Sequence, residues 1–193
     1  MSSVTGVILS GGKSTRMKTD KAFLKFGSRT MIEELISRLE KKFSKLIIIA
    51  NDKERYAGIG IEVLEDIIPD KGPLGGIYTA LVKSDSLYNF IFSCDAPFVN
   101  FDLIDYMITR VNNFDIVVPK WQARLEPLHA IYSKNCVETI EKQLKNGELK
   151  ITNLFSKLSV NVIGQKELER FDLGDSPFMN INTPEDYATI RQI

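Results

Sequence analysis

The sequence predicts a single three-layer α/β domain over residues 1–193, with a mainly parallel sheet between two layers of helices. Short apolar runs of strand length alternate with amphipathic helical repeats along the chain, which is typical of this class. Several of the apolar runs end in glycine-rich or acidic clusters. The length of 193 residues and the apolar fraction of 44% suit one globular domain, and no repeat or linker divides the sequence.

Three strands and two helices are expected in the N-terminal half. Ile32, Leu35 and Leu39 recur at helical spacing and predict an amphipathic helix over 30–42. Pro73 suits the first turn of a helix, so a second helix is expected over 74–82. The expected strands, each a short apolar run, are 5–9, 46–50 and 62–64.

The C-terminal half continues the same alternation. Its expected strands are again short apolar runs, at 89–93, 115–118, 128–132 and 160–163. Its expected helices are 104–111, 135–145 and a closing helix at 184–191 with Thr183 as the N-cap.

Polar clusters follow three of the expected strands. The first strand runs into Ser10-Gly11-Gly12, the third into Glu65-Asp66, and the fourth into Cys94-Asp95. Ligands of open α/β sheets bind outside the carboxyl ends of the strands. The sequence therefore predicts a functional site where these clusters meet.

The segment after the first strand combines glycines with positive charge. Gly11 and Gly12 would let the backbone approach a ligand closely, and Arg16 and Lys21 add cations that suit phosphate. The alternative is a tight turn with a solvated basic face. Gly12-Lys13-Ser14 resembles the end of a P-loop, but Val7 stands where that motif requires glycine. A P-loop is therefore rejected.

The acidic clusters have two interpretations each. Asp95, at the end of an apolar strand, suits either a hard cation such as Mg²⁺ or an N-cap for the following segment. Asp66 precedes the glycine-framed helix start Gly72–Ile77, whose N-terminus could face an anion or could serve only close packing. Asn180 and Asn182 similarly suit a helix entry or an oxygen-rich ligand site.

The only histidine and the overall charge exclude several functions. His129 lies in an apolar run, so a core or rim imidazole is favoured over a catalytic base, and neither a hydrolase triad nor a zinc site is supported. Lys plus Arg equals Asp plus Glu at 25 each, so no global field would attract nucleic acid or an anionic membrane. Two cysteines and no membrane-length apolar run favour a cytoplasmic protein.

Five motifs in order resemble those of the molybdenum cofactor guanylyltransferases. The first is the segment from Leu9 to Ala22, LSGGKSTRMKTDKA, which resembles the family signature LAGG-x-S-x-RM…DKA. The later ones are Gly72–Ile77, Cys94–Pro97, Glu126–Ala130 and Asn180–Pro184. Ser10 replaces the usual alanine, and Lys18 a frequent glycine, and neither change removes a group that the chemistry requires.

The resemblance implies a Rossmann-like nucleotidyltransferase fold and roles for individual residues. It implies nucleotide contacts for Leu9, Ser10, Gly11, Gly12, Lys21, Asn51, Asp66 and Asp95. Arg16 and Lys21 would stabilise the triphosphate, and Asp95 would bind Mg²⁺ as cofactor. The residues implied to face the pterin or to complete the metal site are Glu126, Pro127, His129, Asn180 and Asn182.

The reaction implied by the resemblance is transfer of GMP from GTP to molybdopterin. Molybdopterin cytidylyltransferases and other small-molecule phosphate nucleotidyltransferases are the alternatives, and Gly12 favours the guanylyl branch because cytidylyl relatives usually carry Ala-Ala-Gly there. A non-catalytic nucleotide or cofactor carrier is the alternative from another class. Molybdoenzymes or their chaperones and a GTP-binding accessory protein remain open as further partners, with no role for nucleic acid or membrane.

Overall fold

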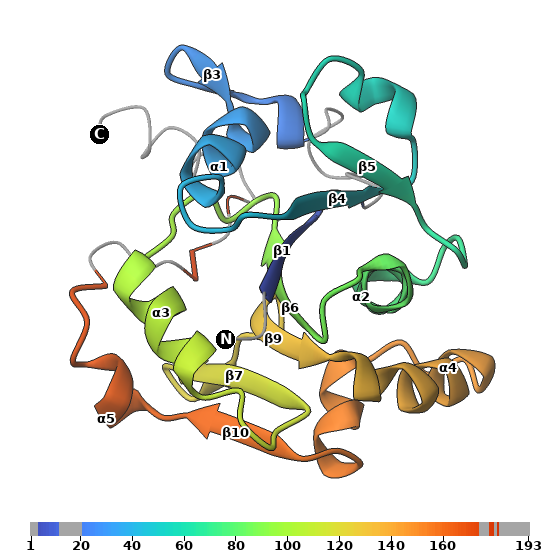
Figure 1. The fold of residues 1–193 in the computed structure, drawn as a ribbon, viewed down its shortest axis with the longest axis vertical. Coiled ribbons are helices and arrows are strands. Elements are labelled where there is room, and N and C mark those ends of the chain that lie inside the picture. Colours follow the sequence, from blue (N-terminus) through green and yellow to red (C-terminus); the bar gives the residue numbers. More distant parts are fainter. Residues whose placement is uncertain (1–3, 12–20, 174–177, 180, 182–193) are drawn as a thin grey trace.

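One mixed sheet passes through the middle of the protein (Figure 1). The computed structural model describes residues 4–11, 21–173, 178, 179 and 181. The strands lie in the order β10 (Val160–Ile163), β7 (Ile116–Trp121), β9 (His129–Ser133), β6 (Tyr88–Ser93), β1 (Val4–Leu9), β4 (Leu46–Ala50) and β5 (Glu62–Glu65), with β8 (Arg124–Leu125) paired to β7.

The sheet is parallel except at β9 and at the short β8. β1 pairs in parallel with β4 and β6, β4 with β5, and β7 with β10, whereas β9 is antiparallel to both β6 and β7. The predicted α/β class with a mainly parallel sheet is therefore confirmed. Because β9 is reversed, its first residue lies beside the carboxyl ends of its neighbours, and His129 pairs with Phe92 near the end of β6.

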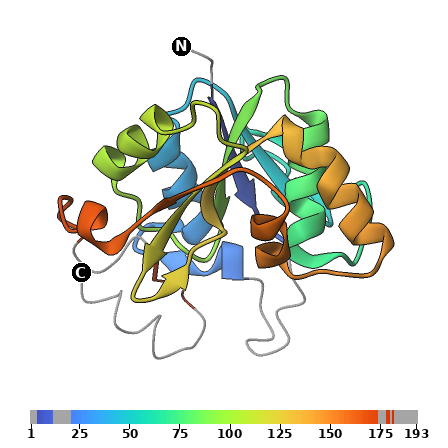
Figure 2. The ribbon, with the colours of Figure 1, turned by 90° about the horizontal axis from the view of Figure 1, so that it is seen from below.

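Helices cover both faces of the sheet (Figure 2). α1 (Met31–Leu39), α3 (Phe101–Thr109) and α5 (Gln165–Leu168) pack on one face, and α2 (Gly72–Lys83) and α4 (Val137–Lys145) pack on the other. Side chains alternate along the strands. In β6, Phe90 and Phe92 face α1 and α3, while Ile91 faces α2 and α4.

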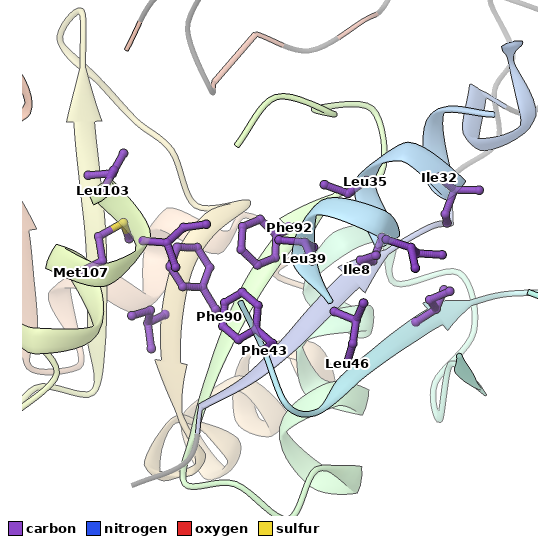
Figure 3. Packing of buried hydrophobic residues seen from close by; sticks show 14 of the residues in the cluster. Ile8, Ile32, Leu35, Leu39, Phe43, Leu46, Phe90, Phe92, Leu103 and Met107 are labelled. Atoms are coloured by element: carbon purple, nitrogen blue, oxygen red, sulfur yellow. The ribbon is translucent and has the colours of Figure 1, made fainter. Parts of the chain in front are cut away.

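The face under α1 and α3 has an aromatic centre (Figure 3). The rings of Phe90 and Phe92 stack with centroids 4.4 Å apart, and Phe43 lies edge-on to both. All three side chains are buried. Buried apolar side chains on each face stabilise the sheet, so the strand ends are held in fixed positions.

Local signals explain where the helices begin. Thr30 and Glu33 form a capping box at α1, and Asn100 caps α3 by accepting from the Leu103 N–H at 2.9 Å. Proline occupies the first turn of α2, as expected. α1 ends at Leu39, three residues before the expected end.

Several short elements were not predicted from the sequence. They are η1 (Lys21–Phe23), β2 (Lys25–Phe26), β3 (Arg29–Thr30), η2 (Lys53–Tyr56), β8, η4 (Ile151–Ser156) and α5, whereas η3 (Lys134–Cys136) forms the start of the helix expected at 135–145. Each is too short to show a periodic apolar pattern. The closing helix expected at 184–191 lies outside the described residues. Within the described ranges, the structure contains no helix long and apolar enough to cross a membrane.

Candidate functional site

Backbone hydrogen bonds join three strand ends at the carboxyl edge of the sheet. The Ser10 N–H donates to the Ile49 carbonyl at 2.8 Å, so β1 and β4 end together. The Cys94 N–H donates to the Leu9 carbonyl at 3.1 Å, which ties the end of β6 to β1. The glycine segment and the Asp95 segment therefore start from neighbouring points.

Tyr56 holds the backbone at Ser10. Its hydroxyl donates to the Ser10 carbonyl at 3.2 Å and lies 2.7 Å from Ser10 Oγ. The Tyr56 ring also packs against Phe23, with centroids 5.1 Å apart. Since Phe23 belongs to η1, this contact places the backbone of Lys21 close to the same strand end.

Asn51 lies directly beside Gly11. A Cβ atom built on Gly11 would lie 3.4 Å from Asn51 Nδ2 and 3.6 Å from its Cγ. A methyl group would fit with ordinary contact, but a branched side chain would displace the amide of Asn51. These two residues thus form one polar surface at the ends of β1 and β4.

Asp66 lies on the other side of Leu9, near the first turns of α2. A Cβ atom on Gly76 would lie 3.1 Å from Leu9 Cδ2, so Leu9 would have to shift, and 3.8 Å from Asp66 Oδ1, which is ordinary contact. Thr79 Oγ1 accepts from the Ile67 N–H at 2.9 Å and donates to Asp66 Oδ1 at 3.3 Å. Burial raises the pKa of Asp66, and the hydrogen bond from Thr79 opposes that rise.

Asp95 is positioned by two hydrogen bonds. Ser93 Oγ donates to Asp95 Oδ1 at 2.5 Å, and the Ile181 N–H donates to the Asp95 carbonyl at 2.8 Å. Ile181 is fully buried and packs on Met31 at the start of α1. The alternative interpretation of Asp95, an N-cap for the following segment, does not apply to the next helix, α3, because its N-cap is Asn100.

His129 is part of the aromatic core. Its ring lies edge-on to Phe90, Phe92 and Phe178, with centroids 5.2 to 5.4 Å apart. Burial lowers the pKa of His129 to about 3, so the imidazole is neutral at physiological pH. Among the described residues, Nε2 has no hydrogen-bond partner. The structure thus agrees with the preference for a core imidazole over a catalytic base.

Glu126 and Pro127 occupy the turn that leads into β9. Burial raises the pKa of Glu126 to about 7, against the opposing effect of the positive charge of Arg124. The Pro127 carbonyl accepts from the Tyr132 hydroxyl at 2.8 Å, which is a structural contact. Glu126 is therefore the residue of this turn whose carboxyl group is partly withdrawn from water.

The structure places only part of the expected site. Leu9, Ser10, Gly11, Asn51, Asp66 and Asp95 meet at one edge, whereas Gly12, Arg16, Asn180 and Asn182 lie outside the described residues. For Lys21 only the backbone is described. Within the described part of the chain, no group of three or more His, Cys, Asp or Glu side chains could hold a metal ion.

Sequence reasoning missed several residues that shape this edge. Tyr56, Thr79 and Ser93 support Ser10, Asp66 and Asp95 respectively. Thr79 and Ser93 lie in apolar segments, where an isolated hydroxyl side chain is a weak sequence signal. Nothing in the sequence indicated a role for Tyr56, because the short helix η2 that contains it was not predicted.

Taken together, the sheet topology and the polar strand-end cluster define an α/β protein with a candidate ligand site at its carboxyl edge, a fold that it shares with nucleotidyltransferases of known structure. A crystal structure of molybdopterin-guanine dinucleotide biosynthesis protein A from Archaeoglobus fulgidus superposes with a TM-score of 0.85, at 22% identity, over 98% of this chain and 97% of that one. The 2-C-methyl-D-erythritol 4-phosphate cytidylyltransferase of Thermus thermophilus superposes with a TM-score of 0.70, at 14% identity, over 100% and 98% of the two chains. At these identities the likeness shows the shared fold.

The chain belongs to the MobA-like NTP transferase family, whose domain model matches residues 6–162. It is 38% identical over 191 residues to a probable molybdenum cofactor guanylyltransferase of Clostridium perfringens (strain 13 / Type A), covering 96% of this chain and 95% of that protein. A molybdenum cofactor guanylyltransferase of Desulfosudis oleivorans is 36% identical, covering 96% and 93%.

Proposed function

We propose that this protein transfers GMP from GTP to molybdopterin, forming molybdopterin guanine dinucleotide and pyrophosphate. The observation that supports it is the meeting of Ser10-Gly11, Asn51 and Asp66 with Asp95 at one sheet edge, in a chain whose relatives are named for this reaction. Glycine-framed backbone suits phosphate, and the carboxylates suit a hard cation and polar ligand groups.

The transfer is an in-line displacement at phosphorus. An oxygen of the acceptor phosphate forms a bond to the α-phosphorus of GTP, and the bond from that phosphorus to the oxygen bridging to the β-phosphate breaks. Pyrophosphate leaves with the electron pair, and nothing is oxidised or reduced. The acceptor phosphate is ionised near neutral pH, so charge neutralisation and alignment matter more than a general base.

The described residues would hold the nucleotide from two sides of β1. The backbone of Leu9, Ser10 and Gly11 approaches the ligand, Asn51 offers amide groups to the base or ribose, and Asp66 offers a carboxylate near α2. Cations of Arg16 and Lys21 would complete the phosphate side. Asp95, linked to Leu9 through Cys94, would lie at the reacting phosphate.

Mg²⁺ fits the chemistry of the donors at Asp95. The carboxylate is oriented by the Ser93 hydroxyl, and oxygen ligands of this kind are those that Mg²⁺ prefers. Asp95 would hold the ion together with phosphate oxygens and water, which accounts for the small number of protein carboxylates here. When bound, Mg²⁺ supplies charge neutralisation to the triphosphate.

Pterin contacts for Glu126, Pro127, His129, Asn180 and Asn182 remain part of the proposal, with His129 acting through packing. Both cysteines are thiols, which suits a cytoplasmic enzyme. A GTP-binding accessory protein and molybdoenzymes or their chaperones are further proposed partners. Cytidylyl transfer is disfavoured because the relatives at 36–38% identity are named guanylyltransferases.

Mass spectrometry of the products tests the proposal. The protein is incubated with molybdopterin, Mg²⁺ and GTP, CTP, ATP or UTP in turn. The expected result is a molybdopterin guanine dinucleotide and pyrophosphate with GTP alone. A cytosine dinucleotide formed at an equal rate would contradict the guanylyl assignment, and binding of GTP without pyrophosphate release would favour a carrier.

A further inference from the structure

The end of β1 is joined directly to the segment that carries Asp95. β1 and β6 are paired in register as far as Leu9 and Ser93. The Cys94 N–H then donates to the Leu9 carbonyl at 3.1 Å. Asp95 is the next residue along the chain, so its main chain starts from a fixed position beside Leu9.

A longer path joins Asp95 to η1, the short helix that begins at Lys21. Leu24 follows η1 directly, and its carbonyl accepts from the N–H of Met31 at 2.9 Å. The Met31 side chain packs on Ile181, whose N–H donates to the Asp95 carbonyl at 2.8 Å. Two hydrogen bonds and one apolar contact therefore connect the end of η1 with Asp95, although these residues are far apart in the sequence.

Ile181 lies in a small apolar cluster that is separate from the two cores of the sheet. Ile181 and Met31 are fully buried, and three partly buried side chains pack against them. The cluster thus consists of Leu24, Met31, Phe98, Met179 and Ile181, and we call it the anchor cluster. Its members come from the residue after η1, the start of α1, the segment after Asp95 and residues 179 and 181. Packing in the anchor cluster therefore holds these parts of the chain together.

The Ile181 hydrogen bond acts on the main chain of Asp95, whereas the Ser93 hydroxyl acts on its carboxylate. Ser93 Oγ lies 2.5 Å from Asp95 Oδ1 and sets the direction of the side chain. That direction places the carboxylate only if the Cα atom from which the side chain extends is itself fixed. Ile181 can fix it, because a close-packed and fully buried side chain has little freedom to move and holds its own N–H in place.

We propose that Ile181 is a positioning residue for the reaction, because its burial in the anchor cluster keeps Asp95 aligned with η1 and Lys21. This inference rests on the proposed function, in which Asp95 holds Mg²⁺ and Lys21 stabilises the triphosphate. Alignment of the ion with the triphosphate requires that these two residues keep their relative positions. Ile181 would touch neither ligand, since its side chain is fully buried.

Calorimetry of GTP binding without an acceptor tests this role directly. The Kd for GTP is measured in Mg²⁺ and in EDTA, because the ratio of the two values reports the alignment of the ion with the triphosphate and does not depend on the fraction of folded protein. Ile181→Ala should reduce this ratio about tenfold, the size of effect that follows loss of a group orienting a metal ligand. The Kd in EDTA should change much less, because the ends of β1 and β4 are not altered.

Matched variants separate positioning from loss of stability. Ile140→Ala truncates a fully buried isoleucine of α4 in the other core, and it should lower the unfolding temperature while keeping the wild-type ratio. Ile181→Val keeps most of the buried side chain and should restore most of the ratio. If Ile181→Ala does not fold, Leu24→Ala weakens the anchor cluster at a partly buried position and should reduce the ratio severalfold.

Three results would overturn the proposal. They are a wild-type ratio in folded Ile181→Ala or, where that variant does not fold, in Leu24→Ala; an equal reduction of the ratio in Ile140→Ala; and a GTP affinity of the wild-type protein that Mg²⁺ does not change. Failure of the proposed function would look different. Mg²⁺-dependent GTP binding that Ile181→Ala weakens, without transfer of GMP to molybdopterin, would support the role of Ile181 and count against the proposed function alone.

Discussion

The two halves of the carboxyl edge are built differently. At the ends of β1, β4 and β5, small residues and backbone groups dominate, and Gly11 and Gly76 leave space beside Asn51, Leu9 and Asp66. At β7 and β9, aromatic rings and a half-buried carboxyl dominate. The first composition suits phosphate and ribose, and the second a planar heterocycle. Asp95, at the end of β6, lies between the two halves.

Asp95→Asn should have the largest effect on the reaction. Loss of the carboxylate that lies between the halves should reduce kcat by about a hundredfold or more, because several kcal/mol of transition-state stabilisation would be removed. Steady-state kinetics at saturating Mg²⁺ measures this. Asp105→Asn, which removes an exposed carboxylate on α3 that pairs with Lys42, is the matched control. Wild-type rates in Asp95→Asn would show that the reaction does not need the carboxylate between the two halves.

Gly11→Val should damage the first half alone. The branched side chain would displace Asn51, whose Nδ2 lies 3.4 Å from the position of a Cβ. The KM for GTP should rise about tenfold or more, equivalent to the loss of roughly one good hydrogen bond. Gly164→Val is the control, since nothing lies within 4 Å of a Cβ there. An unchanged KM for GTP would remove Gly11 from the nucleotide site.

The second half should show opposing pH effects on stability. The folded-state pKa of His129 lies at about 3, below its usual value of 6.5, so its contribution to the free energy of unfolding falls as pH falls through 6.5. The folded-state pKa of Glu126 lies at about 7, above its usual 4.5. Its contribution to the free energy of unfolding therefore rises as pH falls from about 7 to 4.5. The largest slope from one group is about 1.4 kcal/mol per pH unit, and solvent reduces that of half-buried Glu126.

Between pH 6.5 and 4.5 these two slopes therefore oppose each other. The charged group that faces Glu126 is Arg124, and the ring of His129 faces Phe90, Phe92 and Phe178. Urea unfolding of Glu126→Gln should show steeper loss of stability toward pH 4.5 than the wild type, and His129→Phe a shallower one. Parallel slopes in all three proteins would contradict the assigned burial.

Tyr56→Phe should have the smallest effect. It removes the hydroxyl that donates to the Ser10 carbonyl at 3.2 Å while keeping the ring packed on Phe23. One neutral hydrogen bond contributes about 1 kcal/mol, so the KM for GTP should rise several-fold. Steady-state kinetics with GTP varied would measure this KM, and an unchanged value would mean that the Tyr56 hydroxyl is not needed to position Ser10.

The sequence predicted the fold better than it predicted the second half of the site. The strands β4 and β10 were placed to the residue, and in buried β4 this is because the apolar run ends abruptly at Asn51. The reversal of β9 left no trace, since a buried strand has the same apolar pattern in either direction. The hairpin of β7 and β8 was missed because Gln122 and Ala123 are not the usual residues of its turn.

The most direct test of the division into two halves is the pair of KM values in two variants. With GTP and molybdopterin varied in turn, Gly11→Val should raise the KM for GTP about tenfold and leave that for molybdopterin near the wild-type value. Glu126→Gln should do the reverse by a similar factor. If either variant raised both KM values equally, the two ligands would share one surface and the account would be contradicted.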